Sequence, residues 1–481
     1  MTKQIQKEKW ILYRHTRSFK LLVSLAKILK SFSKTKINKE DKAKLNLHLR
    51  ELGLYNERNP NLVLDAISHK INQLSFYMFG YQAKIDGNSR FLFSPLGNLF
   101  LKYADNESVS AKIFLTMLWG MQFEHPHGGS DKRFQLYPFR LIFKLLNDKR
   151  LDYKLYAYEV AYLVVFVEKI NKDTCENLIE NILSLRAKTH EQIADLFHND
   201  PHTYVNAVYE WDCYTSNLLC SAGILHKTNG VIITRLQHGN TNTFRKVASN
   251  SIAIAHDLRD FVTKLEKSDS FLHAPLLLDD GERLRIDVVK EVYSYYPKIL
   301  LETIGAFYDE SQNYLEIPKL IETYADNPDR SASDLFENVL VDGFNMFYNI
   351  KAKKLGGAGK TDIECLYVTK KKKFAVEAKS TANKLLGINT SRLREHREYI
   401  GGEYTIIITP RYVPAARRDI SDTPNVIILA NTFAEYLYNC IDNDVRQIDY
   451  EEFDVIIKQN LGKDISQHIS NLSILKFGLG K

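Results

Sequence analysis

Long hydrophobic runs are missing from this sequence of 481 residues. The nearest candidate for a membrane span, Ala161–Val167, is far shorter than the ~18 apolar residues that such a helix needs. Near the N-terminus, Lys27 and Lys30 interrupt the apolar segment that a secretory signal would require. We therefore expect a soluble chain without a membrane partner.

Cysteine is also scarce, since the chain has five cysteines and no C-x-x-C pair. This number and spacing disfavour a disulfide framework and a zinc site, and they fit a reducing cytoplasm. Hydrophobic residues make up 44% of the chain and charged residues 26%, which is ordinary for a folded soluble protein. At ~150 residues per domain, the length predicts about three domains.

Net charge is small, at +7, but it is unevenly distributed. Residues 1–50 hold fourteen lysines and arginines against three acids, and Lys351–Lys373 holds eight lysines against two acids. Basic segments of this kind attract the phosphates of nucleic acids. A solvated surface remains an alternative for either segment alone, whereas two such segments in one chain favour nucleic acid as a partner.

Helical spacing of apolar residues predicts a mostly α-helical region over residues 1–170. In the next region, 171–305, a helix over Tyr204–Ala222 is followed by a strand over Gly230–Leu236 and a polar turn. This order is typical of winged-helix modules, which place a helix in the major groove of DNA, although it also occurs in many other folds. If the module is present, its candidate base-reading residues are Arg235, Gln237, His238, Asn240 and Arg245.

The third region, residues 306–481, contains the strongest strand signals. A predicted helix carries Glu337 at the edge of its apolar stripe. The glycine-rich turn Gly356–Gly359 leads into Lys360-Thr361, so it must be tested as a phosphate-binding loop. That motif needs another glycine where Lys354 stands, and it continues into a helix, whereas here a strand follows. An ATPase of the P-loop type is therefore excluded.

Two short strands, Ile363–Thr369 and Phe374–Ser380, flank the lysine-rich segment Lys370–Lys373 and predict a hairpin. With the four lysines as its loop, Glu364 lies opposite Lys379. Side chains alternate between the faces of a strand, so apolar and aromatic residues share one face of the hairpin. The other face collects Asp362, Glu364, Glu377 and Lys379.

Clustered carboxylates repel one another and raise one another's pKa. A bound divalent cation relieves that repulsion, and Mg²⁺ prefers such oxygen ligands together with water and phosphate. The ion can activate water and neutralise charge at a phosphodiester, while a lysine stabilises the charge that develops or assists deprotonation of the water. The alternative is an exposed sheet face that carries only cross-strand ion pairs.

Asp362, fourteen intervening residues and then Glu377-Ala378-Lys379 resemble the signature of the PD-(D/E)XK nuclease superfamily, with Thr361 in place of the proline. The wider context is similar to the AlwI-type group of type IIS restriction endonucleases. The segments that carry this wider resemblance are Ser94–Gly97, Tyr137–Arg140, Phe336-Glu337, Val376–Lys379, His396 and Tyr404–Pro410.

The resemblance implies a magnesium-dependent active site. Asp362 and Glu377 would bind Mg²⁺, Lys379 would be the catalytic lysine, and Glu337 would be a further catalytic or metal-binding acid. His396, on a predicted helix after the hairpin, would reach the scissile phosphate, although it could equally be a helix-surface residue of no consequence.

The resemblance also implies a multidomain enzyme. Residues 1–170 and 171–305 would recognise a short asymmetric site on double-stranded DNA, and residues 306–481 would form an α/β nuclease core with a mixed central sheet that cuts a fixed distance away. A homodimer or a second subunit would be needed to cut both strands, and the cytoplasm of a prokaryote would be its location. A structure-specific repair or recombination nuclease and a non-catalytic DNA-binding protein remain alternatives.

Overall fold

The computed structural model describes most of the chain, in two compact units. The first unit comprises residues 1–278 and 295–304, and the second comprises residues 279–294 and 305–481. The expected division of the first unit near residue 170 stays a prediction. The described residues are 7–13, 17–31, 37–53, 63–85, 88–239, 241–279, 285–305, 310–327, 332–355, 360–443, 445 and 447–477.

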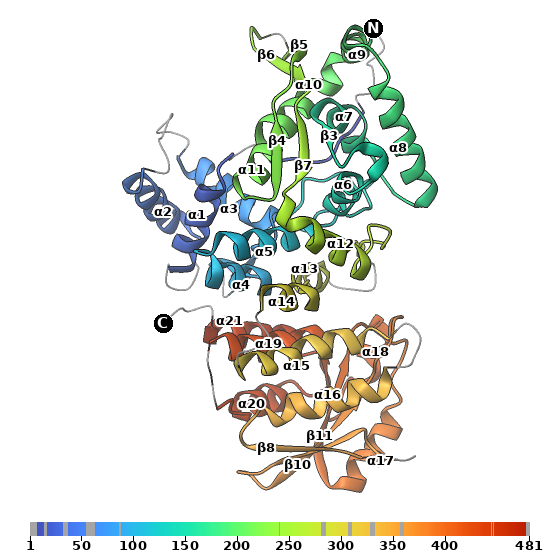
Figure 1. Cartoon of the computed structure of the whole chain (residues 1–481). Helices are drawn as coiled ribbons and strands as arrows, with labels where there is room; N and C mark the ends of the chain where they lie inside the picture. Colours follow the sequence, from blue (N-terminus) through green and yellow to red (C-terminus); the bar gives the residue numbers. More distant parts are fainter. Residues whose placement is uncertain are drawn as a thin grey trace, which may run out of the picture. The chain divides into compact units, whose positions relative to one another are not determined.

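The first unit is mostly helical, as the apolar spacing predicted (Figure 1). Its strands form small sheets, in the orders β1-β2, β3-β7-β4 and β5-β6. None of the helices in the described part of the chain is both long and apolar enough to cross a membrane. The elements of this unit are α1 (Phe19–Ser31), α2 (Lys39–Glu51), α3 (Val63–Phe76), β1 (Gly80–Ile85), β2 (Asn88–Phe93), α4 (Pro95–Tyr103), α5 (Glu107–Gly120), α6 (Pro138–Leu146), β3 (Leu155–Tyr156), α7 (Ala157–Tyr162), α8 (Lys172–Arg186), α9 (His190–Asn199), α10 (Pro201–Glu210), α11 (Ser216–Ser221), β4 (Leu225–Thr228), β5 (Ile232–Gln237), β6 (Phe244–Ala248), β7 (Ser251–Ile254), α12 (Arg259–Ser268) and α14 (Lys298–Ile304).

The helix predicted over Tyr204–Ala222 is present, but it contains an irregular turn. It consists of α10 and α11, with a π-helical turn at Trp211–Thr215 between them. The strand predicted after it is β5, which forms an antiparallel hairpin with β6. Among the candidate base-reading residues, Asn240 lies outside the described residues, and the other four lie on or beside this hairpin.

The second unit contains a five-stranded sheet in the order β12-β11-β10-β9-β8. Strands β8, β9 and β10 are antiparallel, and β10, β11 and β12 are parallel, so the sheet is mixed, as predicted. The elements are α13 (Arg285–Tyr293), α15 (Glu310–Ala325), α16 (Ser333–Asn345), β8 (Ile350–Lys354), β9 (Ile363–Tyr367), β10 (Lys372–Ala378), α17 (Thr390–Ile400), β11 (Gly402–Thr409), α18 (Pro414–Asp419), β12 (Asn425–Leu429), α19 (Ala430–Asp442), α20 (Glu451–Gln459) and α21 (Ser466–Phe477).

Helices cover both faces of this sheet (Figure 1). The larger core joins one face to α15, α16, α19, α20 and α21, and it includes Ile363, Cys365 and Val376. A smaller core on the opposite face joins Leu393 of α17 to Ile407 of β11 and to β12. The central strands are therefore buried on both sides, which explains their nearly continuous apolar sequences.

The register of the β9–β10 hairpin differs from the prediction by four residues. Phe374 pairs with Cys365 and Ala375 with Glu364, because the turn is at residues 368–371 and not at the four lysines. Glu364 and Lys379 are therefore not opposite each other, and that part of the prediction is wrong. A shift by an even number leaves each side chain on its predicted face, since the side-chain period is two.

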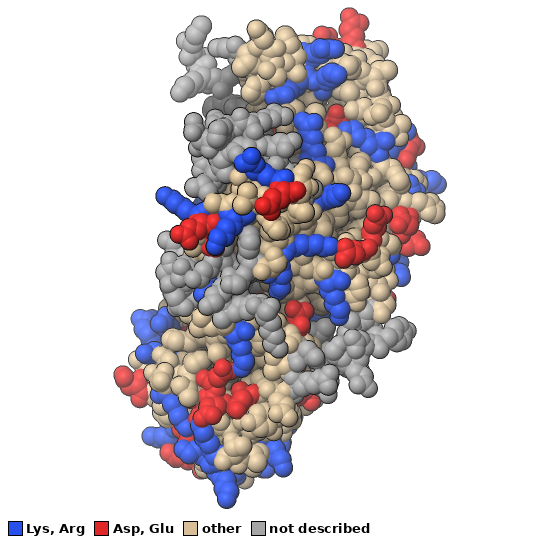
Figure 2. Space-filling model, turned by 90° about the vertical axis from the view of Figure 1, so that its left-hand side faces the viewer, with Lys and Arg blue, Asp and Glu red and all other residues tan. Residues whose placement is uncertain are grey.

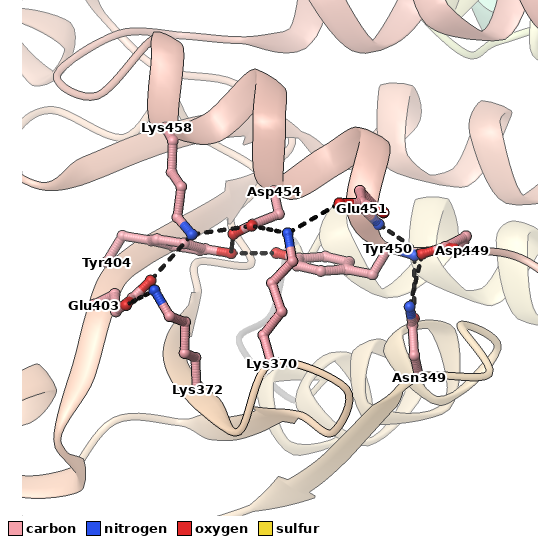
Figure 3. A network of polar contacts seen from close by, with 10 residues as sticks. All are labelled: Asn349, Lys370, Lys372, Glu403, Tyr404, Asp449, Tyr450, Glu451, Asp454 and Lys458. Atoms are coloured by element: carbon pink, nitrogen blue, oxygen red, sulfur yellow. Dashed lines mark hydrogen bonds and ion pairs between the residues drawn. The ribbon is translucent and has the colours of Figure 1, made fainter.

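Lysines at the tip of this hairpin are held by acids, as Figure 3 shows. Lys370 lies 3.2 Å from both Glu451 and Asp454 of α20, and Lys372 lies 2.5 Å from Glu403. Lys458 also contacts Glu403 and Asp454, at 3.2 and 3.0 Å. The hairpin tip is thus fastened to α20 and to the start of β11.

Candidate active site

Asp362 and Glu377 come together on the sheet face that α17 covers. Asp362 directly precedes β9, and its Oδ2 accepts a hydrogen bond of 2.8 Å from the backbone N–H of Ala378. Glu377 lies near the end of β10 and is only 1% exposed. Continuing the hairpin register by one residue from the Ile363–Val376 pair puts Asp362 opposite Glu377. Both carboxylates therefore project from the same side of the ribbon.

Lys379 completes this group at the end of β10. Its Nζ donates a hydrogen bond of 2.6 Å to Oε1 of Glu377, and its backbone N–H bonds to the carbonyl of Ile408. About a third of the side chain is exposed, at 36%. The ammonium is therefore fixed beside a buried carboxylate while it remains accessible to a substrate.

The ionisation of Asp362 reflects this crowding. Burial raises the pKa of Asp362, and the negative charge of Glu377 raises it further, to about 6. The positive charge of Lys379 and the Ala378 N–H act in the opposite direction. Asp362 thus carries a negative charge in a place where a proton or a cation would stabilise it.

His396 lies in the interior and not on the helix surface. It comes from α17, is 2% exposed, and its Nδ1 lies 3.7 Å from Oε2 of Glu377. Both of these atoms are buried without a hydrogen-bond partner. On the other side of the ring, Nε of Arg392 lies 3.4 Å from Nε2. His396 is therefore not a helix-surface residue, and its expected role at the scissile phosphate stays a prediction.

Glu337 lies on α16, close enough for its charge to contribute to the raised pKa of Asp362. Its carboxylate pairs with Lys354 of β8 at 3.0 Å, and the same lysine also pairs with Asp334. Its expected role as a metal-binding acid stays a prediction.

Glu364 shares this face but serves a different purpose. It pairs with Lys353 at 3.3 Å across the β8–β9 ladder and with Lys373 at 2.8 Å diagonally across β9–β10. The third carboxylate of the predicted cluster is thus neutralised by lysines, which matches the alternative of cross-strand ion pairs at this one position.

A divalent cation fits the two remaining carboxylates. Within the described part of the chain, no group of three or more His, Cys, Asp or Glu side chains is arranged to hold a metal ion. Mg²⁺, however, commonly uses one or two carboxylates and completes its coordination with water and phosphate. The unpartnered Oε2 of Glu377 and the raised pKa of Asp362 are consistent with such a ligand pair.

Two residues that were not predicted from the sequence hold the chain just after Lys379. Asn327 is 2% exposed, and its Nδ2 donates to the hydroxyls of Ser333 and Ser380, both at 3.1 Å. Arg411 donates to the carbonyl of Ala382 at 3.0 Å. A single asparagine in a loop belongs to no recognisable sequence pattern, so these hydrogen bonds are evident only in the tertiary structure.

Basic residues are dispersed on the face of the molecule that Figure 2 shows. On this face, acidic side chains lie between the lysines and arginines. Of the eight lysines in the segment 351–373, five form ion pairs with acids. The glycine-rich turn between them, Gly356–Gly359, lies outside the described residues. Most of this segment therefore stabilises the sheet, and its expected attraction for DNA stays a prediction.

Comparison with known proteins assigns the chain to a family. A family model described as "Type II restriction endonuclease HgaI, N-terminal domain" matches residues 5–268. The type II restriction enzyme HgaI of Avibacterium volantium is 45% identical over 477 residues, which cover 98% of this chain and 98% of the relative.

Solved structures give weaker similarities. The BpuJ1 endonuclease binding domain, in complex with pyrene- and phenanthrene-modified DNA, has a TM-score of 0.39 and 15% identity, over 60% of this chain and 96% of that chain. Restriction endonuclease FokI has a TM-score of 0.27 and 10% identity, over 94% of this chain and 99% of that chain. The family assignment rests on the two sequence matches. The chain belongs to the HgaI family of type II restriction endonucleases, which are site-specific deoxyribonucleases.

Proposed function

We propose that the second unit hydrolyses DNA phosphodiester bonds with Mg²⁺, in a PD-(D/E)XK-type active site formed by Asp362, Glu377 and Lys379. The observation that carries this proposal is the convergence of two carboxylates and one lysine on one face of β9 and β10, where Lys379 Nζ lies 2.6 Å from Glu377. The resemblance of the sequence Asp362…Glu377-Ala378-Lys379 to that nuclease signature supports it.

Each residue has a distinct role in this proposal. Asp362 and Glu377 would hold Mg²⁺, which when bound activates water and neutralises charge at the phosphodiester. Lys379 stabilises the negative charge that develops on the phosphate, since its ammonium is fixed beside the site. Glu337 adds negative charge near Asp362. It would act either as a further Mg²⁺ ligand or as the ion-pair partner that orients Lys354. His396 acts as a positioning residue for Glu377, because it is buried beside that carboxylate.

We further propose that cleavage occurs at a fixed distance from a short asymmetric site, as in type IIS enzymes. The HgaI N-terminal family model covers residues 5–268, which fall in the first unit, whereas the candidate active site lies in the second unit. If one unit recognises the DNA and the other hydrolyses it, the recognised site and the cleaved bond lie at different positions on the DNA. The first unit would include a winged-helix-like module, with the β5–β6 hairpin as its wing.

The proposed site is tested by Asp362→Ala and Lys379→Ala. We expect each to reduce cleavage of linear duplex DNA about a hundredfold or more, because each removes a group that acts on the reacting phosphate. The measurement is the rate of fragment formation with Mg²⁺, together with DNA affinity in EDTA, which should stay within a few-fold. EDTA should abolish cleavage by the unmodified chain, and Mg²⁺ should restore it.

Glu364→Gln provides the matched control. This residue is a carboxylate on the same strand face, but it is neutralised by Lys353 and Lys373. Its substitution should leave cleavage within a few-fold. Normal cleavage by either test variant would mean that the site is assigned to the wrong residues.

A further inference from the structure

Two arginines distant in sequence meet on a pair of tyrosines in the first unit. Cζ of Arg17 lies 4.5 Å from the ring centroid of Tyr214, and Cζ of Arg245 lies 3.4 Å from that of Tyr209. The two tyrosine rings pack edge to face at 5.1 Å, and their hydroxyls are hydrogen-bonded at 3.2 Å. The N-terminal segment, α10, the π-helical turn and β6 thus all contribute to one cluster.

Neither guanidinium in this cluster is neutralised by an acid among the residues that the structure describes. Nε of Arg245 is buried and has no hydrogen-bond partner. The nearby acid of the π-helical turn, Asp212, is already bound by Lys227 at 2.8 Å and by Asn250 at 2.9 Å. The cluster therefore holds two positive charges and at least one unused donor.

Both arginines act on the same tyrosine. The hydrogen bond with Tyr214 lowers the pKa of Tyr209, and the positive charges of Arg245 and Arg17 lower it further. Because the two tyrosine rings are in contact and each carries one arginine, both guanidinium groups belong to one small cluster. A π-helical turn is also a feature that occurs frequently at functional sites.

The adjoining hairpin carries further positive charge, on the face opposite to that of Arg245, because neighbouring residues of a strand alternate between its faces. The segment 231–249, which includes β5 and β6, contains no aspartate or glutamate. Arg235 and Lys246 are directly opposite each other in the β5–β6 ladder, and both are exposed. Like charges in such a pair destabilise a hairpin, and a nearby anion relieves that repulsion.

We propose that Arg17 and Arg245 bind one backbone phosphate of the DNA, and that Tyr209 and Tyr214 orient their guanidinium groups. Arginine suits this role because its planar fork matches phosphate oxygens and stacks on aromatic rings. A phosphate contact fixes the position of the protein on the duplex without reading its sequence. The proposal depends on the DNA-binding role of the first unit and is independent of the residues proposed for hydrolysis.

The test compares Arg17→Ala, Arg245→Ala and the double variant with the unmodified full-length chain. The probes are a duplex that the unmodified chain cuts and the same duplex with its sequence scrambled, both in EDTA. We expect the double variant to lose affinity by a similar factor on both duplexes, about tenfold or more. The slope of log affinity against log salt concentration should decrease in magnitude by about 1, as for one lost phosphate contact.

Two further variants separate binding from folding. Arg245→Lys keeps the charge, so it should recover part of the affinity and the full salt slope if a phosphate is bound. Arg150→Ala removes an arginine of the same unit that is already paired with Asp148 and Glu176, and it should change neither quantity. An unchanged salt slope in the double variant, or a loss no larger than that of Arg150→Ala, would overturn the proposal. Because these measurements are made without Mg²⁺, they hold even if Asp362→Ala still cleaves DNA.

Discussion

The two oxygens of Glu377 have different surroundings. Oε1 accepts a hydrogen bond from Lys379, whereas Oε2 is buried and faces Nδ1 of His396 at 3.7 Å. Because only Oε1 is hydrogen-bonded, the Glu377 carboxylate could rotate about its terminal bond. The neighbouring imidazole of His396 restricts this rotation. Groups that orient a metal-binding side chain commonly affect metal affinity by 10–100-fold when removed.

We therefore predict that His396→Ala lowers the cleavage rate by about tenfold and raises the Mg²⁺ concentration needed for half-maximal rate. His396→Asn should recover part of both effects, because its amide can place a donor where Nδ1 stands. Single-turnover cleavage across a range of Mg²⁺ concentrations measures this, and DNA affinity in EDTA should not change. The exposed His468, on α21, gives a control substitution. An unaltered Mg²⁺ requirement in His396→Ala would show that His396 has a packing role only and does not orient Glu377.

At the scale of elements, the β9–β10 hairpin depends on contacts made at both of its ends. At its open end, Asp362 and Ala378 are joined by a hydrogen bond. At its tip, Asp454 is 2% exposed and accepts hydrogen bonds from Tyr404, Lys370 and Lys458 at 3.0–3.2 Å (Figure 3). Anchoring of the tip to α20 should therefore contribute to the stability of the whole sheet.

Substitution of Asp454 tests this anchoring through pH. Burial alone would raise the pKa of Asp454, but hydrogen bonds from Lys458 and Lys370 outweigh burial and lower the pKa below its usual 3.8. A lowered pKa in the folded state stabilises the protein above the usual value, and this stabilisation disappears as pH falls through the lowered value. Asp454→Asn should therefore cost about 2 kcal/mol near neutral pH, and the difference should shrink in acid.

Thermal melting of both proteins from about pH 7 to about pH 2, which passes through the lowered pKa, measures this difference. Glu451→Gln is the matched control, because Glu451 contacts only Lys370 among these lysines and its side chain is 59% exposed. An exposed pair of this kind contributes at most about 1 kcal/mol. A difference between Asp454→Asn and the unmodified chain that stays constant with pH would contradict the assigned ionisation.

At the scale of the whole molecule, the chain offers one candidate active site in its second unit for two DNA strands. We predict that cleavage of both strands requires a second copy of the chain. Supercoiled plasmid should accumulate as the nicked form at low protein concentration, and linear product should rise as concentration increases. Addition of Asp362→Ala chains to the unmodified chain should shift the products toward nicked DNA, because mixed pairs cut one strand. Linear product formed at a rate independent of concentration would favour a single chain that cuts the strands in sequence.

Much of the fold follows from local patterns, and strand β8 is an exception. The helices, the hairpin and the parallel strands β11 and β12 follow from apolar periodicity within each segment. Strand β8, Ile350–Lys354, was missed because three of its five residues are lysines. It is an edge strand, where charged residues are common since they oppose unwanted pairing. Its identity depends on β9, which comes later in the chain.

By itself, the sequence determined which side chains share a face of the β9–β10 hairpin, because alternation along a strand depends only on residue number. It also determined the spacing of Asp362, Glu377 and Lys379. Tertiary structure alone decided that Glu364 is neutralised by Lys353, that His396 is buried against Glu377, and that Arg17 and Arg245 stack on neighbouring tyrosines. These contacts join different elements, and no local pattern encodes which elements pack together, since that choice is made by the burial of apolar surface over the whole unit.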